Sequence, residues 1–205
     1  MDNPLSPSIP SPARFLSLLQ KSRLPILGDG AMGTQLNACG VDFEQCFDAL
    51  NLSNPSLVAE IHNSYIDAGS QIIQTNTFGA NRYKLAAHGL DNQVIEINHA
   101  GVELARRAAL VSSRDVLVAG DVGPLGVRLA PFGRVQPEQA RQAFSEQIAA
   151  LVQAGIDLLI IETFSDLNEL REAVAAARRV EMTSAASLPL VASMTWPSNP
   201  WVASL

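Results

Sequence analysis

The 205-residue sequence lacks the features that direct proteins to nucleic acids, to membranes or to the cell exterior. It has no excess of positive charge: 14 lysines and arginines stand against 20 aspartates and glutamates, so the basic surface that nucleic acids require is absent. No apolar run approaches the roughly 18 residues of a membrane-spanning helix. The first residues contain neither a basic segment nor an apolar one, so we expect no secretory signal peptide.

Cysteine is also scarce. Cys39 and Cys46 cannot build a disulfide framework, and this favours a reducing, cytoplasmic compartment. Neither lies beside companion cysteines or histidines at the spacing of a zinc site, so no metal ligand is predicted among these residues. Hydrophobic residues make up 47% of the chain, and its length suits one domain with a sizeable core.

Short apolar runs alternate with helical patterns along the chain. The predicted strands are Leu24–Leu27, Ile72–Gln74, Val116–Ala119, Leu158–Ile161 and Leu190–Ala192. The predicted helices are Ala13–Ser22, Pro55–Ala68, Gln93–Leu110, Pro137–Ala154 and Leu167–Val180. This alternation predicts an α/β fold with a parallel sheet, and the uniformly apolar strands favour burial on both faces, as in a barrel or a doubly wound sheet. Residues 1–12, with four prolines and three serines, are expected to be a disordered lead-in.

Polar residues follow the predicted strands. Residues 68–78 and 154–164 both contain a helix stop, a strand, and a polar residue followed by Thr-Phe, which places Asn76 and Glu162 at equivalent positions. This repeat favours a barrel. Because parallel strands present their carboxyl ends at one edge, Asp29 and Glu162 are candidates to bind a cationic amino group there. Asp121 follows the predicted strand Val116–Ala119 at the same edge, and helix capping is the alternative explanation for its position. Glu162 follows four apolar residues and is expected to be partly buried.

Other motifs are less informative. Gly28-Asp-Gly-Ala-Met-Gly33 matches a dinucleotide-binding pattern, but no helix is expected after it because residues 37–48 are polar. These glycines are better explained by close approach of the backbone to a small ligand. His62, His88 and His99 fall on predicted helices or at their ends, where surface or packing roles are expected.

Four ordered motifs resemble one known family. They are Gly28-Asp-Gly-Ala-Met-Gly-Thr34, Gln74-Thr-Asn-Thr-Phe-Gly-Ala-Asn81, Gly120-Asp-Val-Gly-Pro124 and Glu162-Thr-Phe-Ser-Asp166. Together they resemble the homocysteine S-methyltransferase family, including the homocysteine-binding module of cobalamin-dependent methionine synthase and of bacterial fusions with methylenetetrahydrofolate reductase.

The resemblance implies a (β/α)8 TIM barrel, of which residues 13–195 form the N-terminal part with about five βα units. It implies that Asp29 and Glu162 bind the amino group of homocysteine. It further implies that Thr34, Asn76 and Thr77 line the same pocket. In the family, a Zn²⁺ ion held by cysteine thiolates keeps the substrate sulfur as a thiolate, which attacks the methyl group of a donor and yields methionine.

The sequence departs from the family in two ways. The zinc-binding cysteines of the family lie late in the barrel and have no counterpart here, so we expect this chain to bind no zinc and to be inactive alone. Residues 196–205 form an atypical tail rich in proline and tryptophan. Two alternatives stay open: a non-catalytic subunit completed by a partner chain, and a different barrel enzyme acting on an amino acid. The donor is also open among methyltetrahydrofolate, S-methylmethionine and S-adenosylmethionine, as are folate, cobalamin or reductase domains in a longer parent protein.

Overall fold

The computed structural model describes residues 12–184 and 188–195, which form an α/β structure around a parallel sheet. The four strands lie in the sequential order β1-β2-β3-β4. They are β1 (Ile72–Gln74), β2 (Leu117–Val122), β3 (Leu158–Phe164) and β4 (Leu190–Met194). Sequential parallel order with a helix in every connection defines successive βα units, as the sequence predicts.

The helices cover the sheet and its ends. Before β1 lie α1 (Pro12–Lys21), α2 (Met32–Ala38), α3 (Leu50–Ser53) and α4 (Pro55–Ala68). After β1 come α5 (Arg82–Ala86), the 3₁₀ turn η1 (Asp91–Gln93) and α6 (Val94–Val111), then α7 (Pro137–Ala154) and α8 (Leu167–Ser184). The predicted bounds of α4 and α7 are confirmed. Both helices begin with proline at the first turn and end at a left-handed glycine, Gly69 or Gly155.

Two predictions near the start of the chain are wrong. Leu24–Leu27 forms no strand; the segment joins β1 only through a single bridge between Gly28 and Ile72. Pro25 has no N–H to donate to a ladder, and Leu24 remains 78% exposed. A helix, α2, does follow the glycine motif, because Leu36 is fully buried and anchors an otherwise polar turn.

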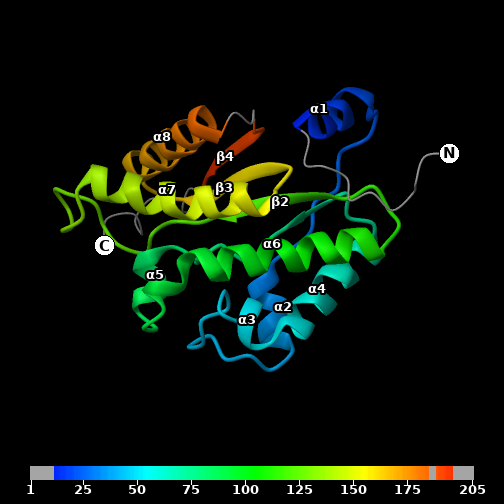
Figure 1. Cartoon of the computed structure of the whole chain (residues 1–205), viewed down its shortest axis with the longest axis horizontal. Helices are drawn as coiled ribbons and strands as arrows, with labels where there is room; N and C mark the ends of the chain where they lie inside the picture. The colour runs from blue at the N-terminus through cyan, green and yellow to red at the C-terminus, as the bar shows by residue number, and fades with distance from the viewer. Residues whose placement is uncertain (1–11, 185–187, 196–205) are drawn as a thin grey trace.

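The main core lies between the outer face of the sheet and the long helices. Figure 1 shows α6, α7 and α8 running side by side along the sheet, with α4 flanking α6. Small residues, such as Ala143 and Ala173, let the helices approach one another closely, while Phe144 and Phe164 pack ring to ring at 5.8 Å.

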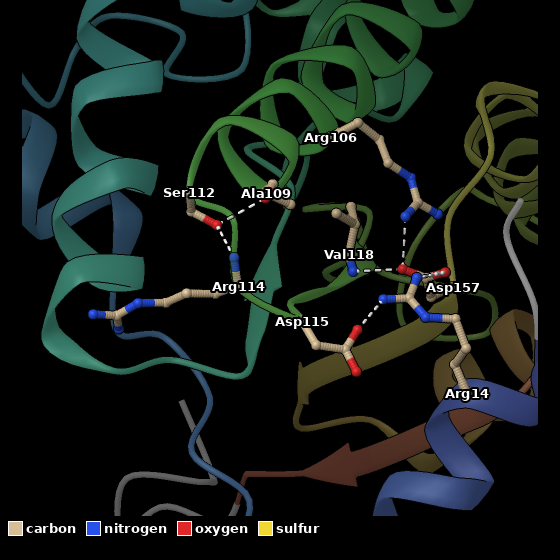
Figure 2. Close-up of polar contacts among 8 residues, drawn as sticks. All are labelled: Arg14, Arg106, Ala109, Ser112, Arg114, Asp115, Val118 and Asp157. Carbon is tan, nitrogen blue, oxygen red and sulfur yellow. Dashed lines mark hydrogen bonds and ion pairs between the residues drawn. The ribbon is translucent and has the colours of Figure 1, made fainter. Parts of the chain in front are cut away.

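Helix α1 covers the opposite, inner face at the amino ends of the strands. Its Phe15 and Leu18 pack against a cluster that includes Leu117 and Leu158. Figure 2 shows Asp157 between Arg14 of α1 and Arg106 of α6.

The buried carboxylate of Asp157 accepts hydrogen bonds from three groups. Arg106 donates at 2.8 Å, the Val118 N–H at 2.8 Å and Arg14 at 3.3 Å. Arg14 also donates to the exposed Asp115 at 2.5 Å. This network fastens α1 and α6 to the amino end of the sheet.

Two predictions concern residues that the structure does not describe. The lead-in over residues 1–12 lies among them except for Pro12, the first residue of α1, and the tail over residues 196–205 lies among them entirely. None of the helices in the described ranges combines the length and the apolar character that crossing a bilayer requires.

Candidate functional site

A cavity of about 920 Å³ opens at the carboxyl ends of β1, β2 and β3. Its wall combines these strand ends with the segment between Asp29 and Asp48 and with residues around α5. Asp29, Asn76, Asp121 and Glu162, which the sequence places at strand ends, all line it. In parallel α/β folds this is the edge at which ligands bind.

Asp29 projects into the cavity directly after the bridge at Gly28. Its Oδ2 accepts a hydrogen bond from the backbone N–H of Gln74 at 2.8 Å. Burial raises the pKa of Asp29 to about 7, opposed by that hydrogen bond and reinforced by the negative charge of Glu162. Asp29 is therefore a carboxylate without a neutralising cation beside it, and an ammonium group would supply one.

Glu162 reaches the cavity through an irregularity in β3. The pairing of β3 with β4 shifts register between Ile161 and Phe164. Within this bulge Thr163 has φ of 64°, a left-handed conformation that is strained for a β-branched residue. Local strain of this kind concentrates where side chains must be re-aimed, and here it lies at the cavity wall.

Asp121 is buried near the end of β2. Its Oδ1 has no hydrogen-bond partner among the described residues. Burial raises the pKa of Asp121 well above its ordinary value, and the negative charges of Glu162, Asp48 and Asp29 add to the effect, while Lys84 opposes it. A carboxyl group in this position has unused capacity to bind a cation or to donate as the acid.

Two residues that the sequence analysis did not single out complete the charged wall. Asp48 accepts a hydrogen bond from the Gly79 N–H at 2.9 Å, and burial raises its pKa to about 6. A side chain at Gly79 would lie 2.6 Å from the Asp48 carboxylate, so glycine is required there. Lys84 extends from α5, and burial lowers its pKa against the pull of Asp48. Both come from irregular or short segments with no periodic signal in the sequence.

Three residues that the family resemblance places in one pocket, Asn76, Thr77 and Thr34, lie in different parts of the structure. Asn76 lines the cavity, but its side-chain nitrogen donates to the Phe47 carbonyl at 2.8 Å and to Asn51 at 3.1 Å, which ties the covering segment to β1. Thr77 is fully buried and Thr34 is exposed on α2, and neither belongs to the cavity wall.

Thr77 instead holds the backbone of β2. Its hydroxyl donates to the Asp121 carbonyl at 2.8 Å and contacts the Thr75 hydroxyl at 2.6 Å, so Thr75 must be the donor of that second bond. The Asp121 N–H in turn donates to Thr75. This closed set of hydrogen bonds positions Asp121 at the cavity.

The remaining candidates do not form a metal centre. His62 is buried in α4, as a packing role requires, whereas His88 lines the cavity from the end of α5. Cys39 is exposed and Cys46 faces the cavity. Burial and the charge of Asp48 raise the pKa of Cys46, which disfavours the thiolate that binds metal. Within residues 12–184 and 188–195, no three histidine, cysteine or acidic residues are placed to hold one ion.

The fold and the cavity thus define a (β/α)-barrel type of ligand site at the carboxyl ends of parallel strands. Residues 26–202 match the family described as homocysteine S-methyltransferase, and the chain belongs to that family. It is 34% identical over 183 residues to methionine synthase of Mycobacterium tuberculosis and 31% identical over 179 residues to that of Mycobacterium leprae. These alignments cover 85% and 83% of the chain but 15% of each relative.

Solved structures of the homocysteine methyltransferase MmuM from Escherichia coli have the same fold. The metallated form superposes with a TM-score of 0.71 at 29% identity, covering 91% of this chain and 66% of MmuM. The apo form gives a TM-score of 0.67 at 30% identity and covers 90% and 64%. The chain therefore spans slightly under two thirds of MmuM and a small part of the methionine synthases. The TIM-barrel prediction is confirmed as part of such a barrel.

Proposed function

We propose that this chain supplies the amino-acid-binding half of a homocysteine S-methyltransferase site. The observation that carries the proposal is the pair of carboxylates Asp29 and Glu162, which face one cavity at the carboxyl edge of the sheet in a member of this family. The ammonium group of homocysteine would neutralise both charges. Asp121 lies close enough to sense both of them and extends the acidic wall.

The chain's own residues account for binding and orientation. Asp29 is aligned by the Gln74 N–H, and Glu162 is directed inward by the bulge of β3. In the proposed complex Asn76 keeps the segment around Phe47 over the bound amino acid, whereas Thr77 acts indirectly through the position of Asp121. Thr34 lies outside this arrangement.

The zinc ion implied by the family does not fit the residues described. Cys46 is the one thiol among them that faces the cavity, and no companion ligands surround it. We therefore assign no step of methyl transfer to this chain alone. The methyl donor, and any folate, cobalamin or reductase domains, stay predictions that follow from the family resemblance.

The exposure of β4 supports further structure beyond residues 13–195. Strands of parallel sheets are normally covered on both faces, yet Val191 in β4 is 39% exposed. Additional βα units, from the same polypeptide or from a partner chain, would cover it. A partner-completed barrel is thus the second candidate arrangement.

Calorimetric titration of the chain with homocysteine tests the proposal. Because protonated Asp29 cannot neutralise an ammonium group, the association constant is expected to fall about tenfold per pH unit below pH 7 and to level off above it. Asp29→Asn should remove this pH dependence and weaken binding at least about tenfold, whereas Asp115→Asn, at the opposite end of the sheet, should change neither. Absence of binding, or equal binding by Asp29→Asn, would refute the proposal.

A further inference from the structure

A buried glutamine lies in the middle of α7, outside the wall of the cavity. Gln147 is fully buried, and its neighbours about one turn away on either side, Phe144 and Leu151, belong to the main hydrophobic core. Its side-chain nitrogen donates to the carbonyl of Thr77, 70 residues earlier in the chain, at 2.7 Å. Burying an amide costs free energy unless its polar atoms are paired, so a glutamine at this position needs a reason beyond packing.

Thr77 belongs to the segment that follows β1, where the chain has left the sheet. Buried side-chain amides hold the backbone of this segment. Asn51 of α3 donates to the Asn76 carbonyl at 2.8 Å. Gln147 holds the next carbonyl, which also accepts a hydrogen bond from the Ala80 N–H at 3.0 Å. Because Asn76 lines the cavity, these amides fix part of the cavity wall from the helix layer.

The hydroxyl of Thr77 connects this segment to β2. Thr77 Oγ1 donates to the Asp121 carbonyl at 2.8 Å, and the Asp121 carboxyl group lines the cavity with its Oδ1 unpartnered among the described residues. Two successive hydrogen bonds therefore join the amide of Gln147 to the backbone of Asp121. Ligand sites lose function when a supporting contact lets a wall residue move by about 1 Å.

Only one end of the Gln147 amide is paired. Its Oε1 is buried and has no hydrogen-bond partner among the described residues. An unpaired buried oxygen lowers stability, and an apolar side chain of similar volume would avoid that cost. Stability of the core alone therefore does not account for a glutamine here, whereas the bond to the cavity segment does.

We propose that Gln147 is a positioning residue of the amino-acid site: it fixes Thr77, and through Thr77 it sets where the Asp121 carboxyl group lies in the cavity wall. The proposal rests on the function proposed above and adds to it a residue from the helix layer. Gln147 contacts no ligand, so it acts on the affinity for homocysteine only through these two hydrogen bonds.

Gln147→Met tests the proposal because methionine is unbranched, adapts to the same space and has no N–H to donate. Calorimetry of the 205-residue chain is expected to give an association constant for homocysteine about fivefold lower than that of the unchanged chain. Gln153→Met, at an exposed position of the same helix, is the matched control and should leave the constant unchanged. Equal constants for the two variants would overturn the proposal.

A second control separates affinity from stability. Asp157→Asn lowers stability from the opposite end of the sheet, far from the cavity segment, and should leave the association constant of the folded chain unchanged. If Asp157→Asn weakened homocysteine binding as much as Gln147→Met does, the effect of Gln147 would be one of stability and the positioning role would be refuted.

A double-variant cycle tests the route through Thr77. Thr77→Val removes the hydroxyl that reaches Asp121 and should by itself weaken homocysteine binding about fivefold. If Gln147 acts through Thr77, the double variant should bind almost as well as the weaker single variant, whereas independent effects would multiply to about 25-fold and overturn the route. Unchanged binding by Thr77→Val would overturn the proposal even if Gln147→Met failed to fold.

The same titrations distinguish this inference from the proposed function. Homocysteine binding by the unchanged chain, with no loss in Gln147→Met, refutes the positioning role alone. Absence of homocysteine binding by the unchanged chain refutes the proposed function, and the positioning role with it.

Discussion

Buried carboxylates have opposite surroundings at the two ends of the sheet. At the amino end, the fully buried Asp157 receives hydrogen bonds from two arginines and from the Val118 N–H. At the carboxyl end, Asp121 is nearly as buried, yet one of its oxygens has no partner among the described residues and its charged neighbours are mainly acidic.

This contrast separates structural residues from functional ones. A buried charge that is fully paired fixes the elements around it, whereas a buried charge left unpaired lowers stability unless a ligand satisfies it. Placing the unpaired charge at the carboxyl edge agrees with the general division of (β/α) barrels into a stabilising face and a catalytic face. The cost in stability at the cavity is the expected counterpart of ligand affinity.

The largest expected effect lies at the amino end. Asp157→Asn removes the negative charge between Arg14 and Arg106 and should lower the free energy of unfolding by about 3 kcal/mol, since breaking a buried pair leaves charges uncompensated. Urea denaturation measures this loss. Asp115→Asn, which alters a carboxylate that is 85% exposed, should cost less than about 0.5 kcal/mol. Similar losses for the two variants would contradict the role assigned to Asp157.

An aspartate-to-asparagine substitution should have the opposite effect on stability at the carboxyl end. Folding raises the pKa of Asp121, so its ionisation destabilises the folded state once the pH exceeds the unfolded-state pKa, near 4. Asp121→Asn should therefore stabilise the chain by about 1 kcal/mol at pH 8 and by almost nothing near pH 4. Denaturation at both pH values checks this, and a gain independent of pH would show that charge is not its source.

The smallest effect concerns the two non-glycine residues with positive φ in the described chain. Thr163, with φ of 64°, lies at the cavity, and Ser113, with φ of 55°, follows α6 at the other end. Thr163→Gly should stabilise by up to about 1 kcal/mol because a β-branched residue is strained there, whereas Ser113→Gly should be nearly neutral. Thermal unfolding of both variants measures the difference. A larger gain in stability for Ser113→Gly would contradict the assignment of the strain to Thr163 at the cavity.

The sequence predicts the fold well where local signals agree. Pro55 and Gly69 mark both ends of α4 because each restricts or frees the backbone in a known way. The apolar composition of Leu24–Leu27 predicts a strand that does not form, because pairing depends on a neighbour and on N–H groups, and Pro25 has no N–H. Helix α2 has no periodic signal in the sequence, because Leu36 is its one fully buried residue.

The site is only partly predictable for the same reason. Asp29 and Glu162 follow apolar runs, so their positions at the carboxyl edge of the sheet could be inferred, although no strand precedes Asp29 and their substrate roles remain predictions. Asp48 and Lys84 reach the cavity from a loop and a short helix, and only the folded chain brings them together. No residue type signals the positive φ of Thr163, because the bulge in β3 imposes it.

Helix α1 also sets an order of events during synthesis. Its Arg14 bonds to Asp157, 143 residues further along the chain, so the helix cannot dock until β3 has left the ribosome. At typical elongation rates of 5 to 20 residues per second this interval is on the order of ten seconds. Throughout it, Phe15 and Leu18 lack the part of their packing surface that β3 supplies. Helix α1, the first helix in the described part of the chain, is thus among the last elements to find its place.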